Sequence, residues 1–309
     1  MLNTFLKCEA GSRIRYTGML ISAMFVLLSV FTIAQKGLNF GLDFTGGYLT
    51  EFTTSQGVEL KQLEQFIAKN HQGEFELTAQ GNNHFQLTQG PNNTSNNDDW
   101  KTAIIQNPTI NAEVLSSAYI GSQVGDELFE QGCLALFAAM VAVMIYLAVR
   151  FEWRLALGSV VALFHDLVLV VGLFSWLQIE FNLTVLASLL AIIGYSLNDS
   201  IIVGDRVREL LRIPTNITLK PSSIINSAIK STLTRTLITS GTTLATVASV
   251  WLLAGAPLQG FAIALFAGIV VGTLSSICIA ATLPELLGLS AKNYDKQVDQ
   301  QTQALMDMP

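Results

Sequence analysis

The stretch LTVLASLLAIIGYSLNDSIIV, residues 183–203, decides the kind of fold that this chain can adopt. As a helix that rises about 1.5 Å per residue, it is long enough to cross a hydrocarbon core of about 30 Å. Its one charged side chain is Asp199, which lies within an otherwise uncharged and largely apolar run. The stretch therefore predicts a membrane-spanning helix that carries an ionisable group inside the membrane.

Five more apolar runs accompany this stretch in the 309-residue chain. They cover residues 17–34, 133–149, 155–177, 236–253 and 261–283. The first run is too long for the apolar part of a cleavable signal peptide, so we expect it to remain as a helix. The six runs together predict an α-helical polytopic membrane protein with six transmembrane helices.

Lysine and arginine residues mark one side of the predicted membrane. They precede the first run, and they also lie between the second and third runs, between the fourth and fifth, and after the sixth. The opposing short loops, QIEFN (178–182) and AGAPLQG (254–260), contain none. By the positive-inside rule both termini are cytoplasmic, and the segment between the first two runs lies outside.

That outer segment alternates turn residues with short periodic stretches. The expected order is strand, helix, strand, strand, helix, strand, at GYLTEFTT (47–54), VELKQLEQFIAKN (58–70), GEFELTAQ (73–80), HFQLTQ (84–89), DDWKTAIIQN (98–107) and NAEVLSSAYIG (111–121). Asp98 or Asp99 is the expected N-cap of the second helix. This order predicts a small ferredoxin-like α+β domain.

Several classes of function lack support in the sequence. No phosphate-binding loop of the form GxxxxGK[ST] is present, so we expect no ATP hydrolysis, and the net charge of −6 argues against nucleic acid. Cys8, Cys133 and Cys278 have neither a disulfide framework nor a zinc-binding spacing. We expect no metal and no cofactor.

An acid and a base occur at matching depth in the fourth and fifth runs. Asp199 lies roughly 24 Å from the outer end of its helix, and Arg235 lies roughly 27 Å from the outer end of the next, if Pro221 begins a long helix. Paired, the two would offset part of the several-kcal/mol penalty that each charge faces alone. The pair could carry protons, or it could simply hold the two helices together.

Other polar residues suggest a proton path around that pair. His165 and Asp166 lie roughly 17 Å deep, and Ser196 shares the Asp199 side of its helix. The fifth run carries a polar stripe of Thr232, Arg235, Thr239, Thr242 and Thr246. The alternatives are a satisfied core histidine at His165 and threonines that serve helix packing. A small-residue ridge of Gly260, Ala264, Gly268, Gly272 and Ser276 indicates close helix packing.

Four motifs together resemble one family. GLDFTGGYLTEF (41–52), FHDLVLVVG (164–172), GYSLNDSIIVGDRVRE (194–209) and TLTRTLITSGTT (232–243) are similar to the SecF branch of the SecD/SecF family. That family is similar to the resistance-nodulation-division transporters, of which this chain would be one half. The resemblance covers almost the whole chain and departs from the family pattern at Gly204, where a bulky aromatic residue is usual.

The resemblance implies the following organisation: a cytoplasmic N-terminus (1–16), a first span (17–35), a periplasmic domain (36–131), five further spans (132–285) with a cytoplasmic loop (204–230), and a cytoplasmic tail (286–309). It also implies an inner-membrane location, and partnership with SecD, SecYEG, YajC, YidC, an unfolded preprotein and membrane lipid. The implied activity is non-enzymatic, because proton flow would drive late steps of protein export.

Within this resemblance, Asp199 and Arg235 match the proposed proton-relay residues, to which we add Asp166, His165, Thr239 and Ser196. The segment Gly41, Asp43, Phe44, Thr45, Gly46 and Gly47 matches a motif expected to couple the first span to the outer domain. One alternative function is half of a proton-driven small-molecule exporter. Another is a structural scaffold, which predicts that the polar residues within the spans can be exchanged for apolar ones.

Overall fold

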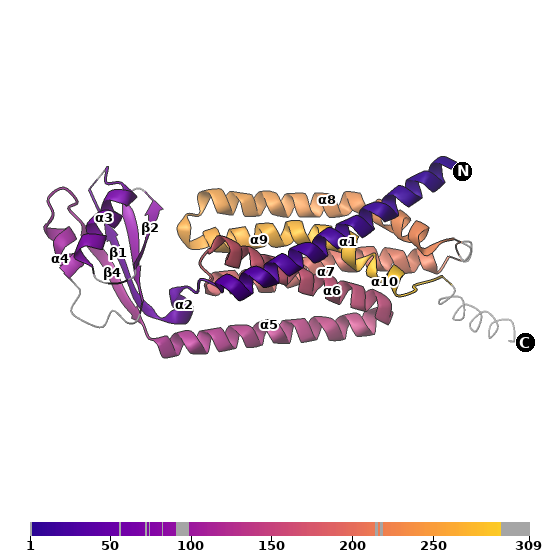
Figure 1. Cartoon of the computed structure of the whole chain (residues 1–309), viewed down its shortest axis with the longest axis horizontal. Coiled ribbons are helices and arrows are strands. Elements are labelled where there is room, and N and C mark those ends of the chain that lie inside the picture. Colours follow the sequence, from indigo (N-terminus) through magenta and orange to yellow (C-terminus); the bar gives the residue numbers. More distant parts are fainter. Residues whose placement is uncertain are drawn as a thin grey trace, which may run out of the picture.

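The computed structural model describes residues 2–55, 57–71, 73, 75–81, 83–90, 99–213, 216 and 219–291, with side chains for all of these except 2–10 and 99. The molecule is elongated, with a bundle of long helices and a small α+β domain at one end of it (Figure 1). Helix α1 begins at the opposite end of the bundle, where α10 also lies (Figure 1).

Among the described residues, six helical segments are long and apolar enough to cross a membrane. They are α1 (Leu2–Lys36), α5 (Ser122–Arg150), α6 (Trp153–Leu177), α7 (Leu183–Leu211), α8 (Pro221–Leu253) and α9 (Ala256–Ser275), the last continuing through a π-helical turn, η2 (Ser276–Ala280), to α10 (Leu283–Leu286). The prediction of six spanning helices is confirmed.

The helices run past the apolar runs at the end remote from the α+β domain. Helix α7 continues to Leu211 and α8 begins at Pro221, so much of the segment 204–230 expected as a loop is helical. Proline at the first helical position costs no hydrogen bond, because that N–H has no intrahelical partner. The last residues of the expected tail, 292–309, lie outside the described part of the chain.

The α+β domain has the predicted order of elements. It contains β1 (Gly47–Thr53), α3 (Leu60–Asn70), β2 (Phe75–Gly81), β3 (His84–Gln89), α4 (Asp99–Gln106) and β4 (Glu113–Ile120). The strands are antiparallel in the order β2-β3-β1-β4, with Phe52 opposite Phe85 and Leu49 opposite Ala118. Phe52, Leu63, Ile67, Leu87 and Trp100 are fully buried between the sheet and its helices. The ferredoxin-like prediction is confirmed, while the expected cap at Asp98 or Asp99 involves side chains outside the described set.

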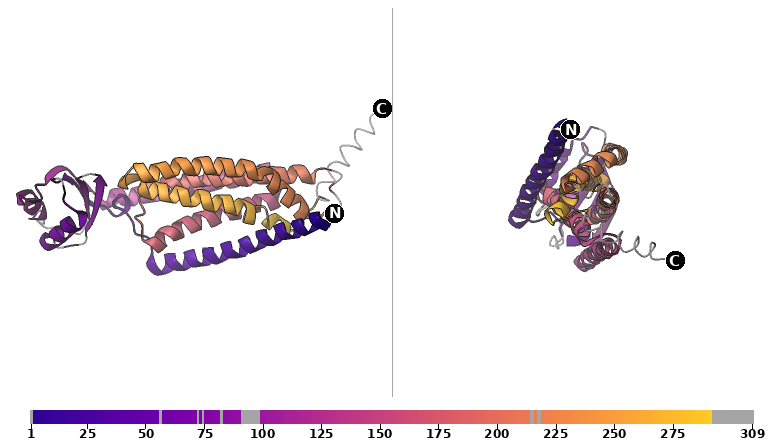
Figure 2. Two further views of the ribbon diagram at one scale, coloured as in Figure 1. Left: turned by 90° about the horizontal axis from the view of Figure 1, so that it is seen from above. Right: turned by 90° about the vertical axis from the view of Figure 1, so that its right-hand side faces the viewer.

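Helix α1 lies along one edge of the bundle (Figure 2), and helix α7 is its centre, since it packs against α5, α6, α8 and α9. Glycines of α9 permit this approach. A Cβ atom at Gly268 would collide with the Ile192 side chain, and one at Gly260 would come within 3.1 Å of Val185. Gly272 faces Ser196 in the same way. The small residues thus lie where α9 meets α7.

Polar contacts tie the helices together at the end remote from the α+β domain. Arg15, which is almost fully buried, pairs with Glu285 at 2.8 Å and also donates hydrogen bonds to Asn226 and Thr282. Nearby in the bundle, the Phe151 ring lies against Gly204, where an added Cβ atom would come within 3.3 Å of it. Gly204 therefore leaves room for the Phe151 ring at this end of the bundle.

Candidate functional site

A carboxyl group at the centre of the bundle joins three helices. Asp166 of α6 is fully buried, and its Oδ1 lies 2.9 Å from Nδ1 of the neighbouring His165. Its other oxygen, Oδ2, accepts hydrogen bonds from the hydroxyls of Ser196 on α7 and of Ser275 on α9, the latter at 2.9 Å. Gly272 leaves room for this cluster, because an added Cβ atom would come within 3.4 Å of Oδ2.

The second buried carboxyl, Asp199 of α7, is in a different state. It is fully buried, and neither of its oxygens has a hydrogen-bond partner among the described residues. Ser240 of α8 lies beside it, and the Ser240 hydroxyl bonds to that of Thr273 on α9 at 2.8 Å. An ionised carboxyl without partners costs several kcal/mol in such surroundings.

Other polar atoms near this point in the fold also lack partners. The hydroxyls of Tyr195 and Ser200 on α7 and of Thr236 on α8 are buried and have no hydrogen-bond partner within the described part of the chain. Buried polar groups are nearly always paired in folded proteins. This concentration of unpaired groups marks the interface of α7 and α8 as the candidate site.

The predicted ion pair between Asp199 and Arg235 is not formed within the described residues, where no contact of 4.0 Å or less joins them. Arg235 is exposed on the outer face of α8, although its charge still acts on Asp199 through space. The reason is the direction in which each side chain leaves the helix. Thr236, the next residue of α8, faces the inside of the bundle and is buried, so Arg235 points away from it.

The threonine stripe of α8 follows Arg235 rather than Asp199. The hydroxyls of Thr239, Thr242 and Thr246 donate to carbonyl oxygens of their own helix, and Thr242 and Thr246 are exposed. Thr232 is buried but also bonds to its own helix, at the Ala228 carbonyl. From Arg235 to Thr246 the stripe therefore lies on exposed or half-buried positions, and its hydroxyls are satisfied by their own helix.

The segment GLDFTGG connects the α+β domain to the bundle. It contains a one-turn helix, α2 (Leu42–Thr45), and Oδ2 of Asp43 accepts a hydrogen bond from the backbone N–H of Leu183 at 2.9 Å. Leu183 is the first residue of α7, whose other cap is the Asn182 side chain. A carboxylate at a helix N-terminus is stabilised by the helix dipole. The motif thus contacts the helix that carries Asp199, in addition to following α1.

The glycines of this motif permit close backbone packing. Gly46 has φ of 69°, and an added Cβ atom would come within 2.8 Å of the Ser122 backbone at the start of α5. Gly41 similarly leaves space for the Glu180 side chain. Burial, and after it the carboxylates of Glu76 and Asp43, raise the pKa of Glu180 above its usual value.

Phenylalanine rings hold the same junction. Phe44 lies within 5.4 Å of Phe129 on α5 and 6.2 Å of Phe181 before α7, measured between ring centroids. Thr45 is exposed, and its hydroxyl bonds locally to the Gly41 and Gly46 carbonyls. Gly47 begins β1, so the motif passes directly from the bundle junction into the sheet.

Sequence reasoning missed three participants in these clusters. None of the three carries a charge; Thr236 and Ser240 lie within the motif at 232–243 but were not selected as site residues, and Ser275 belongs to no motif. Ser275 lies one helical turn after Gly272, which was a usable signal because both face α7 and α6. The π-helical turn that follows Ser275 has no evident signature in the sequence, yet such turns are common at functional sites.

Six apolar helices, buried carboxyl groups within them and a ferredoxin-like domain define the class, a multi-pass membrane protein with ionisable groups inside its membrane region. A family model described as "Protein export membrane protein SecD/SecF, C-terminal" matches residues 101–289, and one described as "SecD/SecF GG Motif" matches residues 31–58. The chain belongs to the SecD/SecF family.

Curated relatives narrow the match to one branch. The chain is 39% identical to "Protein translocase subunit SecF" of Vibrio alginolyticus, with 93% of both chains covered. It is 36% identical to the protein of that name from Escherichia coli O157:H7, with 90% of this chain and 87% of the other covered.

Solved structures agree on the fold. The crystal structure of SecDF from Thermus thermophilus matches with a TM-score of 0.75 at 32% identity, covering 89% of this chain and 37% of that one. A SecDF structure in a "Super-membrane-facing form" matches with a TM-score of 0.67 at 30% identity, covering 95% of this chain and 39% of the other. The chain therefore spans less than half of the SecDF chains that it resembles.

Proposed function

We propose that this chain works with a SecD protein to couple proton entry to a late step of protein export across the inner membrane. The observation that carries the proposal is the Asp199 carboxyl, fully buried within a spanning helix and without a hydrogen-bond partner among the described residues. The free energy of such a carboxyl changes strongly when it gains or loses a proton, because no hydrogen-bond donor compensates the negative charge.

The proton would act by moving helices. Moving one charge across the membrane field is worth about 2.3 kcal/mol per 100 mV, which does work only if two helix arrangements exist. Helix α7 is suited to transmit such a change. It carries Asp199, donates through Ser196 to Asp166, and meets the α+β domain through the bond between Leu183 and Asp43.

SecD is the expected partner, because the similar SecDF structures hold this fold within a chain more than twice as long. One face of α7 favours this reading, because small and polar residues are exposed along it at helical spacing. They are Ala187, Ala191, Gly194 and Asn198. Arg235 is exposed on the adjacent α8, and an arginine exposed at this depth is costly unless another chain supplies an acidic or polar partner. SecYEG, YajC, YidC and the preprotein stay predictions from the family.

The test replaces Asp199 with Asn, which keeps the shape of the side chain and removes its ability to ionise. The matched control is Asp126→Asn, at an exposed position in the first turns of α5. Export of a model preprotein is measured in vesicles that contain the translocase, this chain and SecD, with and without a proton gradient. We expect Asp199→Asn to lose the gradient-dependent part of export while SecD still co-purifies.

Three results separate the alternatives. Normal gradient-dependent export by Asp199→Asn, with assembly intact, would overturn the proton-carrying role of Asp199 and favour the scaffold reading. A gradient-dependent efflux of a small dye, with preprotein export unaffected by any variant, would favour the small-molecule exporter. Loss of function in Asp126→Asn as well would show that the assay reports general damage.

A further inference from the structure

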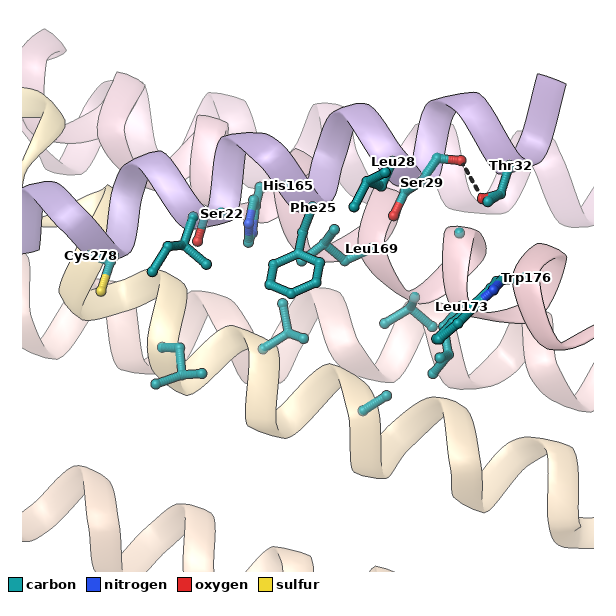
Figure 3. Close-up of a pocket in the computed structure, with 17 residues that line it drawn as sticks. Ser22, Phe25, Leu28, Ser29, Thr32, His165, Leu169, Leu173, Trp176 and Cys278 are labelled. Atoms are coloured by element: carbon teal, nitrogen blue, oxygen red, sulfur yellow. Dashed lines mark hydrogen bonds between the residues drawn. The ribbon is translucent and has the colours of Figure 1, made fainter. Parts of the chain in front are cut away.

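An apolar groove of about 620 Å³ runs along the bundle between α1 and α9, with α6 as its floor. Figure 3 shows Phe25 and Leu28 of α1 together with Leu169, Leu173 and Trp176 of α6 along its length. The groove is open along one side. Every element that lines it is a helix long and apolar enough to span a membrane, or the π-helical turn that continues α9.

The lining selects for hydrocarbon. Most of its surface is apolar, although Ser22, Ser29 and Thr32 also border it, and the Thr32 hydroxyl is already bonded to the Ser29 carbonyl at 2.9 Å. His165 borders the groove, and its Nδ1 is engaged by Asp166, while its Nε2 is buried and has no hydrogen-bond partner among the described residues. A polar ligand would therefore find few free partners, whereas an apolar chain would gain dispersion contacts along the whole length.

The groove has the dimensions of a lipid tail. From Gly18 to Thr32 on α1 it extends roughly 20 Å at about 1.5 Å per residue, more than half of a hydrocarbon core of about 30 Å. One leaflet supplies tails about half that core in length. A tail of about 15 Å that enters from the end near Thr32 would thus extend along about three quarters of the groove, towards His165.

The end nearer the α+β domain carries a cation and an aromatic ring. The Nζ atom of Lys36, the last residue of α1, donates to the Trp176 carbonyl at 3.2 Å, and both side chains are exposed. Tryptophan and lysine are typical of the level where lipid headgroups begin. The ammonium group has two further N–H donors, which suit a phosphate oxygen at this level.

We propose that this groove binds one tail of an anionic phospholipid from the leaflet on the side of the α+β domain, with the headgroup phosphate at Lys36. The tail lies between α1 and α9 and covers the edge of His165, which shields the pair of His165 and Asp166 from that side. The proposal depends on the groove and Lys36, and it stands independently of the proposed export function.

The test measures lipid retained by the full chain in mild detergent, by native mass spectrometry, with phosphatidylglycerol and phosphatidylcholine added in equal amounts. We expect one retained phospholipid with a preference for phosphatidylglycerol. Lys36→Gln should lower that preference roughly fivefold, the effect of removing one lysine near an anionic headgroup, and Lys36→Arg should preserve it.

Groove-filling variants test the position. Ala267→Phe on α9 and Ser22→Phe on α1 place a ring in the groove from opposite walls, and either should abolish retention. Ile238→Phe, on the exposed face of α8, is the control and should retain the lipid. Size-exclusion profiles identify any variant that fails to fold, in which case the other groove variant decides.

Three results would overturn the proposal. Equal retention by Ala267→Phe, Ser22→Phe and Ile238→Phe would place the lipid elsewhere. A headgroup preference unchanged by Lys36→Gln would remove the assigned phosphate contact. Loss of the lipid when SecD is co-purified would show that a helix of the partner, and not a lipid, occupies the groove.

Discussion

The contact between Asp43 and the start of α7 gives a quantitative prediction about how the α+β domain is joined to the bundle. The backbone N–H of Leu183 donates to Oδ2 of Asp43 at 2.9 Å, and Asp43→Ala removes this acceptor. Asp43→Asn keeps an acceptor oxygen but removes the charge. Asp126→Ala, at an exposed position on α5, serves as the control.

The magnitude follows from the geometry of the contact. Loss of a side-chain cap costs about 1 kcal/mol, and loss of a carboxylate from a helix N-terminus costs about 0.3–1 kcal/mol. Because the contact is partly open to solvent, we expect a total of about 1–2 kcal/mol for Asp43→Ala. Asp43→Asn should lose only the part due to charge. A change of 1–2 kcal/mol corresponds to a factor of about 5–30 in the local opening equilibrium.

Hydrogen exchange at the first residues of α7 measures that equilibrium directly. Peptides that cover residues 179–186 should exchange about 5–30 times faster in Asp43→Ala, and by a smaller factor in Asp43→Asn, while peptides within the sheet remain unchanged. Exchange rates for residues 179–186 that are the same in Asp43→Ala and Asp126→Ala would refute the contact as a stabilising one.

Two further predictions concern packing and pH. Gly268→Ala places a methyl group against Ile192 and should lower the free energy of unfolding by about 1–3 kcal/mol. Gly241→Ala has no heavy atom within 4 Å of its Cβ position and should raise that free energy by up to about 1 kcal/mol. Thermal unfolding in detergent measures both variants, and equal effects would contradict the packing of α9 on α7. Burial and two nearby carboxylates raise the pKa of Glu180 above 4.5, so stability present below about pH 4.5 is lost as the pH rises through the raised pKa. The unfolding midpoints of the wild-type chain and of Glu180→Gln should therefore diverge above pH 4.5, because the midpoint of the variant depends less on pH. Parallel curves for the two proteins would show that Glu180 does not cause the pH dependence.

Elements governed by periodicity could be read from the sequence. A run of about 20 apolar residues has one stable form in a hydrocarbon core, because only a helix satisfies all of its own backbone hydrogen bonds there. The α+β domain was predictable for a related reason, since alternation of apolar residues along 47–54 and 84–89 buries one face of each strand. Helix ends were less predictable, because charged residues beyond the apolar run of α7 still favour a helix.

The sequence also predicted only part of the candidate site, namely the depth of its residues and not the direction of their side chains. Depth along a helix follows from residue count alone, so the sequence placed Asp199 and Arg235 at one level. Direction around the helix depends on how neighbouring helices are rotated and shifted, and those angles arise from packing between residues far apart in the chain. The bundle turned Arg235 outward and placed Thr236 and Ser240 on the inner face of α8.

The sequence by itself determined that the chain spans a membrane six times, that it carries a small α+β domain, and that Asp199 lies within a spanning helix. Tertiary structure alone decided that Asp166, and not Asp199, joins three helices, and that Asp43 reaches across to cap α7. The physical reason is that burial follows from the local pattern of apolar residues, whereas a partner is a group brought near by long-range packing.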